Sequence, residues 1–135
     1  MTIKEVSEKF NITPDTLRYY EKVGVIPKVH RTSGGKRDFT ESDISWVQTM
    51  KCFRSAGVPI DMLIEYRELF EEGNKTFEAR CNLLKRAKEK LLEERKRYDD
   101  ALEKLTYKID KYEEACITGE LNWEDEHISK DGVCK

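Results

Sequence analysis

The thiol of Cys52 is the side chain of this 135-residue chain whose surroundings most suggest reactivity. It lies in the stretch KCFRSAG (51–57), between the cations Lys51 and Arg54 on a predicted helix. The thiolate is the reactive form of cysteine, and nearby cations lower the pKa of a thiol. Cys52 flanks the apolar stripe of that helix, so we expect partial access to solvent. The pattern predicts a thiol that reacts with electrophiles or oxidants; the alternative is an inert, half-buried cysteine.

The other three cysteines, Cys81, Cys116 and Cys134, lie far apart and form no CxxC motif. In a cytosolic chain this spacing favours free thiols over a disulfide framework or a zinc finger. Cys81 and Cys116 fall on an apolar helical stripe, where a free cysteine behaves as a small hydrophobic residue. His127 lies between Cys116 and Cys134, but ligands separated by a long acidic tail make a poor preformed cage. We therefore predict neither a metal site nor a cofactor.

The composition and charge of the chain exclude several function classes. There is no nucleophile–base pair, phosphate-binding glycine loop or carboxylate constellation, so an enzyme is not expected. No apolar run approaches the roughly 18 residues of a membrane span, and the N-terminus lacks a signal-peptide core, which predicts a cytoplasmic protein without a membrane partner.

The charges are distributed unevenly along the chain. Residues 1–60 carry 10 Lys and Arg against 7 Asp and Glu, although the whole chain has a net charge of −2. A basic N-terminal part suits a polyanionic partner.

Two short helices are predicted near the N-terminus. Ile3, Val6 and Phe10 recur at helical spacing, and a second helix begins at Pro14 behind the N-cap residue Thr13. Two helices joined by a tight turn form a helix-turn-helix, whose second helix enters the major groove of DNA. An ordinary helical hairpin remains the alternative.

A basic hairpin is predicted after these helices. Extended segments flank the tip sequence TSGG (32–35), and Arg31, Lys36 and Arg37 cluster beside it. A helix-turn-helix followed by such a hairpin is a winged arrangement, with the wing placed to touch backbone phosphates. A charged hairpin that is only a solvated edge is the alternative.

Two further helices complete the predicted DNA-binding domain, residues 1–73. Thr40 caps the third helix with Asp43 as a capping-box acid, and Gly57 ends it. Pro59 opens the fourth helix, and Gly73 interrupts the pattern.

A long dimerisation helix is predicted over residues 74–117. Its apolar residues alternate by four and three, which is the pattern of a coiled-coil seam. So narrow a stripe cannot be buried within one chain, so we expect a homodimer. Lys88 and Arg95 interrupt the seam, and residues 118–135 form a polar tail. The predicted seam residues are Phe77, Leu84, Leu91, Tyr98, Leu102, Leu105, Ile109 and Tyr112.

The order of elements, together with TLRYYEKVGVIP (16–27), GGKRDFTESDI (34–44) and KCFRSAG (51–57), resembles the MerR family of bacterial transcription regulators. The resemblance covers residues 1 to about 75 closely. It implies an all-α fold with a small β-hairpin wing, that is, a winged helix-turn-helix followed by an antiparallel coiled coil.

The resemblance also implies a function. Such dimers bind a pseudo-palindromic promoter whose spacer is too long for RNA polymerase. The activated dimer bends and untwists the DNA, so specificity depends partly on the cost of deforming the spacer. RNA polymerase is then a partner only through promoter geometry, and the protein is expected to be associated with the nucleoid.

The family's DNA contacts can be carried over residue by residue. Arg18, Tyr19 and Tyr20 match recognition-helix positions, and Arg37 matches the wing arginine, whereas Lys36 stands where many relatives carry an aromatic residue. Arginine and tyrosine are suitable phosphate donors, and arginine can also pair with guanine. Tyr20 is open to the alternative of a core aromatic. The full expected DNA-binding set is Thr16, Arg18, Tyr19, Tyr20, Arg31, Lys36, Arg37, Lys51 and Arg54.

The inducer is the remaining expectation. The chain lacks the cysteine loop of the family's metal sensors, and KCFR followed by AG is similar to the branch that responds to aldehydes, other electrophiles or nitrosative stress through one thiol. Cys52 is then the sensor, with Cys116 of the second subunit as a candidate resolving thiol. The alternatives are a small ligand or metal bound at the coiled-coil ends, or a coiled-coil scaffold without regulatory DNA binding.

Overall fold

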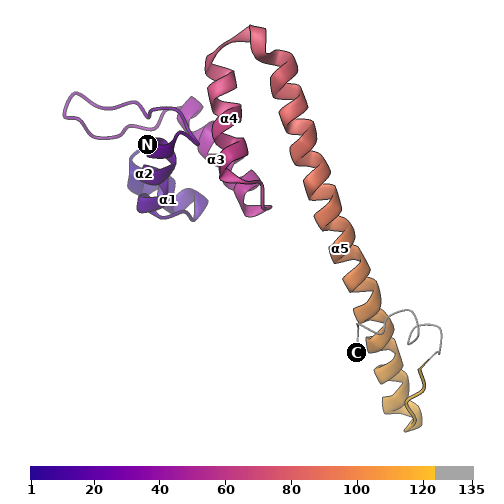
Figure 1. Ribbon diagram of the computed structural model, residues 1–135. Coiled ribbons are helices and arrows are strands. Elements are labelled where there is room, and N and C mark those ends of the chain that lie inside the picture. Colours follow the sequence, from indigo (N-terminus) through magenta and orange to yellow (C-terminus); the bar gives the residue numbers. More distant parts are fainter. Residues whose placement is uncertain (124–135) are drawn as a thin grey trace. The chain divides into compact units, whose positions relative to one another are not determined.

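The computed structural model describes residues 1–123, and every regular element in that range is a helix (Figure 1). The chain divides into two compact units, Met1–Leu92 and Glu93–Lys135, and the last helix contributes to both. The helices are α1 (Ile3–Phe10), α2 (Pro14–Val23), α3 (Glu41–Ser55), α4 (Ile60–Glu71), the short 3₁₀ helix η1 (Asn74–Thr76) and α5 (Phe77–Thr118).

Side-chain caps fix where the first three helices begin. Thr2 and Glu5 form a capping box on α1, and Thr40 and Asp43 form another on α3. The Thr13 hydroxyl caps α2 by accepting a hydrogen bond from a main-chain N–H. Each cap satisfies N–H groups that have no partner within the helix. The caps that the sequence predicts at Thr13 and Thr40 are thus confirmed.

One apolar core joins α1 to α4 in the first unit. Each of these helices turns a stripe of its apolar residues inward, as a 3.6-residue period requires. Trp46 of α3 packs edge-on against Phe70 of α4, with ring centroids 5.1 Å apart. The core residues are Val6, Ile12, Leu17, Tyr20, Val25, Ile26, Val29, Phe39, Val47, Met50, Val58 and Leu63.

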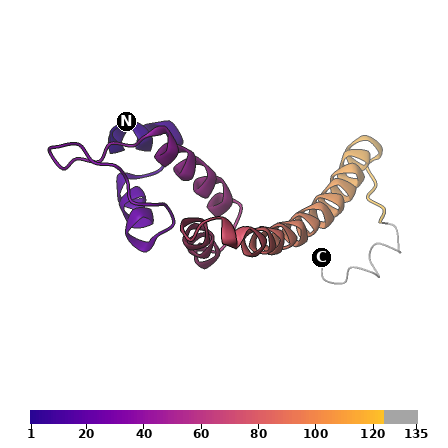
Figure 2. The same ribbon diagram turned by 90° about the horizontal axis from the view of Figure 1, so that it is seen from above.

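The predicted β-hairpin is not confirmed, because no strand occurs within residues 1–123. The segment 27–40 is a loop that projects away from α1 and α2 (Figures 1 and 2). A single antiparallel bridge joins Arg31 to Arg37, and the Asp38 amide donates to the His30 carbonyl over 2.6 Å. One bridge provides too few cross-strand pairs to form a ladder. The basic residues predicted for the wing therefore lie on a bridged loop.

The first turns of α5 pack against the helices before it. Leu83 is buried, Leu91 packs against the core, and the Arg80 guanidinium lies 5.3 Å from the centroid of the Phe70 ring of α4. An apolar cavity of about 320 Å³ lies among α3, α4 and this part of α5. These contacts belong to the first compact unit, which extends to Leu92.

The second unit contains the remainder of α5 and a short return of the chain. The chain turns at Gly119, which has a φ of 80°, and the Trp123 ring packs against Tyr112 with centroids 5.6 Å apart. The Lys108 ammonium lies 4.4 Å from the Trp123 centroid. The predicted tail thus begins with an aromatic contact, while His127 and Cys134 lie outside the described residues.

Within residues 1–123 no helix has both the length and the apolar character needed to cross a membrane.

Gly24 offers a test of how α4 is held to α2. It ends α2 at a φ of 92°, and its carbonyl accepts a hydrogen bond from Arg67 of α4. A Cβ at this position would lie 2.5 Å from Arg67 Nη2. Gly24→Ala should therefore lower the free energy of unfolding by about 1–3 kcal/mol, measured by urea denaturation at fixed protein concentration.

Gly57→Ala is the matched control, because Gly57 has a φ of 98° but no atom within 4 Å of the position that a Cβ would take. Gly57→Ala should report backbone strain alone and destabilise the protein less than Gly24→Ala does. Equal decreases in the free energy of unfolding would show that the Arg67 contact adds nothing.

Candidate nucleic-acid interface

The outer face of α2 presents two of the predicted DNA-binding side chains. Tyr19 is 47% exposed, and Arg18 is also exposed. Arg18 Nη1 lies 2.9 Å from Asp15 Oδ1, one turn back along the helix. Exposed ion pairs of this kind are worth little, so Arg18 can exchange its carboxylate partner for a phosphate or base at small cost. Thr16 lies at the start of the same helix, with its hydroxyl 2.8 Å from that of Thr13.

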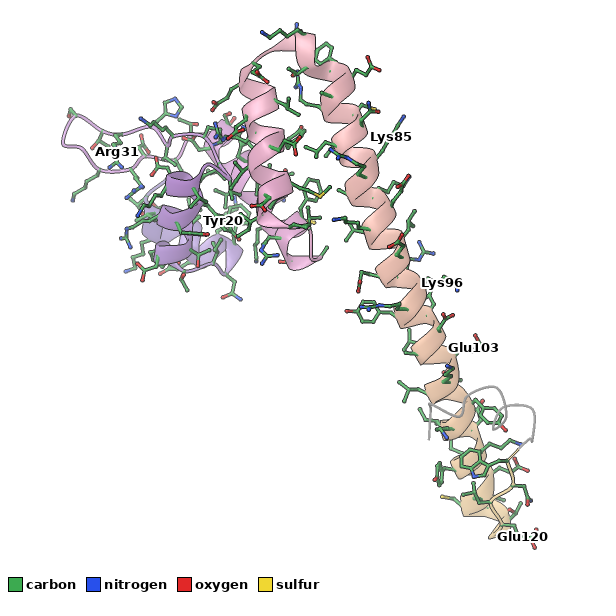
Figure 3. All side chains as sticks on the ribbon, in the orientation of Figure 1. Tyr20, Arg31, Lys85, Lys96, Glu103 and Glu120 are labelled. Carbon is green, nitrogen blue, oxygen red and sulfur yellow. The ribbon has the colours of Figure 1, made fainter. Side chains whose placement is uncertain are left out.

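Tyr20 lies on the opposite side of α2. Its side chain is 7% exposed and belongs to the core, which favours the packing alternative for this residue (Figure 3). The structure therefore separates the neighbouring tyrosines: Tyr19 faces solvent, and Tyr20 packs inside.

The carboxylate of Glu21 binds the basic loop to α2. Its Oε1 accepts a hydrogen bond from Arg37 Nε over 2.8 Å and lies 3.9 Å from Arg31 Nη2. Its Oε2 accepts one from the Val29 amide over 2.7 Å. Burial raises the pKa of Glu21, but the Val29 amide and the Arg37 and Arg31 guanidinium groups outweigh burial and hold that pKa below its ordinary value.

A second carboxylate, that of Asp43, binds the base of the loop to α3. Its Oδ2 lies 2.9 Å from His30 Nδ1 and accepts hydrogen bonds from the Thr40 and His30 amides. Burial raises the pKa of Asp43, yet these hydrogen bonds prevail and lower it overall. One side chain thus completes the capping box of α3 and fixes the loop.

Three further cations of the expected DNA-binding set differ in their hydrogen bonding, namely Lys36, Lys51 and Arg54. Lys36 is exposed near the loop tip. The Lys51 ammonium donates to the Phe10 carbonyl at the end of α1, and Arg54 Nη1 donates to the Val58 carbonyl over 3.4 Å. Lys51 and Arg54 therefore hold main-chain carbonyls in this structure, and a phosphate contact would have to share or replace those bonds.

The thiol of Cys52 is free and exposed on α3. Cys81 and Cys116 are also free and exposed. Across residues 1–123, no three or more His, Cys, Asp or Glu side chains are grouped so that they could hold a metal ion.

The predicted seam of α5 is exposed along most of its length. In the second unit Tyr98, Leu102, Leu105, Ile109 and Tyr112 are 53% to 66% exposed. In the first unit Phe77 and Leu84 are also exposed, and Leu84 and Leu91 line the apolar cavity.

Sequence reasoning missed the roles of Glu21 and Arg67. Glu21 lies one helical turn after Leu17, on the side of α2 that faces the core, and an acid there needs a cationic partner. That signal was available from the sequence, although the identity of the partner was not. Arg67 gave no signal, because its contact with Gly24 joins residues 43 positions apart.

Comparison with known proteins finds similarity to one class of regulator. Residues 1–69 match the family described as MerR HTH family regulatory protein. The HTH-type transcriptional regulator AdhR of Bacillus subtilis is 50% identical over 93 residues, which cover 69% of this chain and 66% of AdhR.

Solved structures extend the similarity beyond the first unit. A Listeria monocytogenes protein assigned to the MerR family of transcriptional regulators is 38% identical, with a TM-score of 0.84 over 98% of this chain and 97% of that one. HiNmlR, described as a MerR family regulator that lacks the sensor domain and is bound to promoter DNA, is 28% identical. Its TM-score is 0.77, over 89% of this chain and 95% of HiNmlR.

Proposed function

The chain belongs to the MerR family of helix-turn-helix regulators, and from that premise we propose a dimeric promoter-binding activator that is switched at Cys52. The matched proteins are transcription regulators, so this chain is a DNA-binding regulator and not an enzyme. The observation that carries the proposal is the joining of the exposed face of α2 to a basic loop by Glu21.

In the proposed complex α2 enters the major groove and the loop contacts the phosphate backbone. Arg18 and Tyr19 are exposed on α2, while Arg31, Lys36 and Arg37 lie on the loop (Figure 3 labels Arg31). Base edges specify the sequence and phosphate contacts fix the register, so a helix and a loop held together supply both functions. HiNmlR, a relative described as bound to promoter DNA, supports this assignment.

The proposed dimer forms through the exposed stripe of α5. A contiguous apolar stripe of this size on a soluble chain marks an interaction surface, and heptad spacing suits a second copy of the same helix. Two copies bring two α2 helices to one pseudo-palindrome. Bending and untwisting of that DNA then affect RNA polymerase through promoter geometry, with no need for direct contact.

The proposed switch is addition of an electrophile to Cys52. For an aldehyde, the thiolate sulfur forms a bond to the carbonyl carbon, the π electron pair moves to oxygen, and oxygen takes a proton from water. No oxidant is required. Cys52 is exposed, and its helix carries Lys51 and Arg54, which bind the carbonyls at the end of α1 and before α4. An adduct on this face of α3 would disturb these bonds and so alter how the DNA-reading helices are held.

A second candidate inducer is a small apolar ligand. The cavity of about 320 Å³ in the first unit is large enough for a small molecule and is lined mainly by apolar side chains. Its walls come from α3, α4 and α5, so an occupant would act on the same helices.

Arg18→Ala tests the DNA-binding part of the proposal. The probe is a duplex enriched by the wild-type chain from a random-sequence library. Affinity should fall by about 10- to 100-fold, because one base or phosphate contact of an arginine is worth about 1–3 kcal/mol. The affinity of each variant for this duplex is measured by fluorescence anisotropy at a fixed salt concentration.

Lys85→Ala removes one exposed positive charge on α5 and serves as the control, with a change of less than about twofold expected. If the two variants bind alike, the assigned role of α2 is wrong.

Cys52→Ala tests the switch. Wild-type protein treated with formaldehyde, methylglyoxal or a quinone should gain adduct mass at Cys52 and activate a promoter reporter, while Cys52→Ala should show neither response. Intact mass and reporter output are measured together, with Cys81→Ala as the matched exposed-thiol control. Induction that survives Cys52→Ala would eliminate the thiol mechanism and leave the cavity ligand.

A further inference from the structure

We infer that Glu21 is a positioning residue for DNA recognition, which sets the loop arginine Arg37 in fixed register with α2. The inference rests on the proposed function, because it gives Arg37 its DNA partner. It adds a negatively charged side chain to a surface that is otherwise assigned to cations, tyrosines and one threonine.

The geometry places one carboxylate between both arms of the loop. Val29 lies on the first arm and donates its amide to Oε2 over 2.7 Å. Arg37 lies on the second arm and donates Nε to Oε1 over 2.8 Å. The Arg31–Arg37 bridge joins the same two arms further along. Main-chain hydrogen bonds join the two arms to each other, and Glu21 adds the contacts that hold both arms to α2.

The carboxylate is too buried to be an incidental surface charge. The Glu21 side chain is only 11% exposed, and that of Arg37 is 22% exposed. A buried charge is tolerated when it is paired and hydrogen-bonded, and both Glu21 oxygens accept short hydrogen bonds. A carboxylate whose two oxygens are both hydrogen-bonded holds the Arg37 guanidinium in one place before DNA binds.

The contact leaves Arg37 able to bind a phosphate. A guanidinium has five N–H donors, and Glu21 takes the one at Nε. Within residues 1–123, no acceptor pairs with the terminal nitrogens of Arg37. One carboxylate beside two guanidinium groups also leaves a net positive charge, so Arg31 and Arg37 together still attract a phosphate.

Two rival roles predict different results. If Glu21 only competes with phosphate, its neutralisation should strengthen binding to every DNA. If Glu21 only supports the fold, neutralisation should lower thermal stability, and the remaining folded protein should bind DNA normally. If Glu21 is a positioning residue, its neutralisation should lower specific binding to DNA. Non-specific binding should stay the same or rise, because a negative charge near the phosphates is removed.

The test is Glu21→Gln in the full chain, which keeps the shape and one acceptor oxygen. The probes are the library-enriched duplex and a scrambled duplex of the same composition, titrated by anisotropy at several salt concentrations. We expect the ratio of specific to non-specific affinity to fall about tenfold. The salt slope on the specific duplex should weaken by about 0.9 for each phosphate that the variant no longer neutralises.

Arg37→Gln and the double variant show whether Glu21 acts through Arg37. In the Arg37→Gln background, Glu21→Gln should change specific affinity by less than about twofold. Glu21→Asp keeps the charge and should recover part of the specificity ratio. Asp38→Asn is the matched control, because it removes an exposed loop carboxylate whose partner is the Met1 amino group, and it should leave the ratio unchanged.

An unchanged specificity ratio in Glu21→Gln would overturn the inference, as would a full effect that persists without Arg37. A lower melting temperature with an unchanged ratio per folded molecule would also overturn it. A wild-type chain that enriches no duplex would instead overturn the proposed function, so the two failures are distinguishable.

Discussion

The apolar stripe of α5 is the constraint on which the proposed architecture depends. Five large side chains in the second unit, from Tyr98 to Tyr112, remain more than half exposed. Their burial at about 25 cal/mol per Å² would contribute several kcal/mol, which a small helical chain has few other ways to gain. The heptad spacing identifies the surface that could supply this burial, namely the same stripe on a second copy. Duplication of the DNA-reading unit follows from that pairing.

Hydrogen bonds between residues far apart in the sequence hold the helices and the basic loop of the first unit together. Glu21 binds the loop to α2, Asp43 binds the base of the loop to α3, and Arg67 binds α4 to the end of α2. Each contact places a charged or polar partner where burial strengthens electrostatic interactions. Together they account for how a loop with one β-bridge can be held in a defined position beside a recognition helix.

The sequence predicted the helices better than their contacts. Capping residues and apolar periodicity are local signals, so the starts of α2 and α3 were predicted correctly. The loop strands were not confirmed, because TSGG and the basic residues indicate a turn but not whether a ladder will form. The carbonyl partners of Lys51 and Arg54, and the role of Glu21, depend on which elements meet in space. A hydrophobic pattern cannot give that information.

The most direct measurement is the mass of the protein–DNA complex in solution. Sedimentation equilibrium of the chain with the library-enriched duplex, and of the chain alone, counts the subunits in each state. The account predicts two chains per duplex, and a free protein of twice the 15.9 kDa chain mass at micromolar concentration. One chain per duplex, or a free monomer that binds the duplex with full affinity, would contradict it.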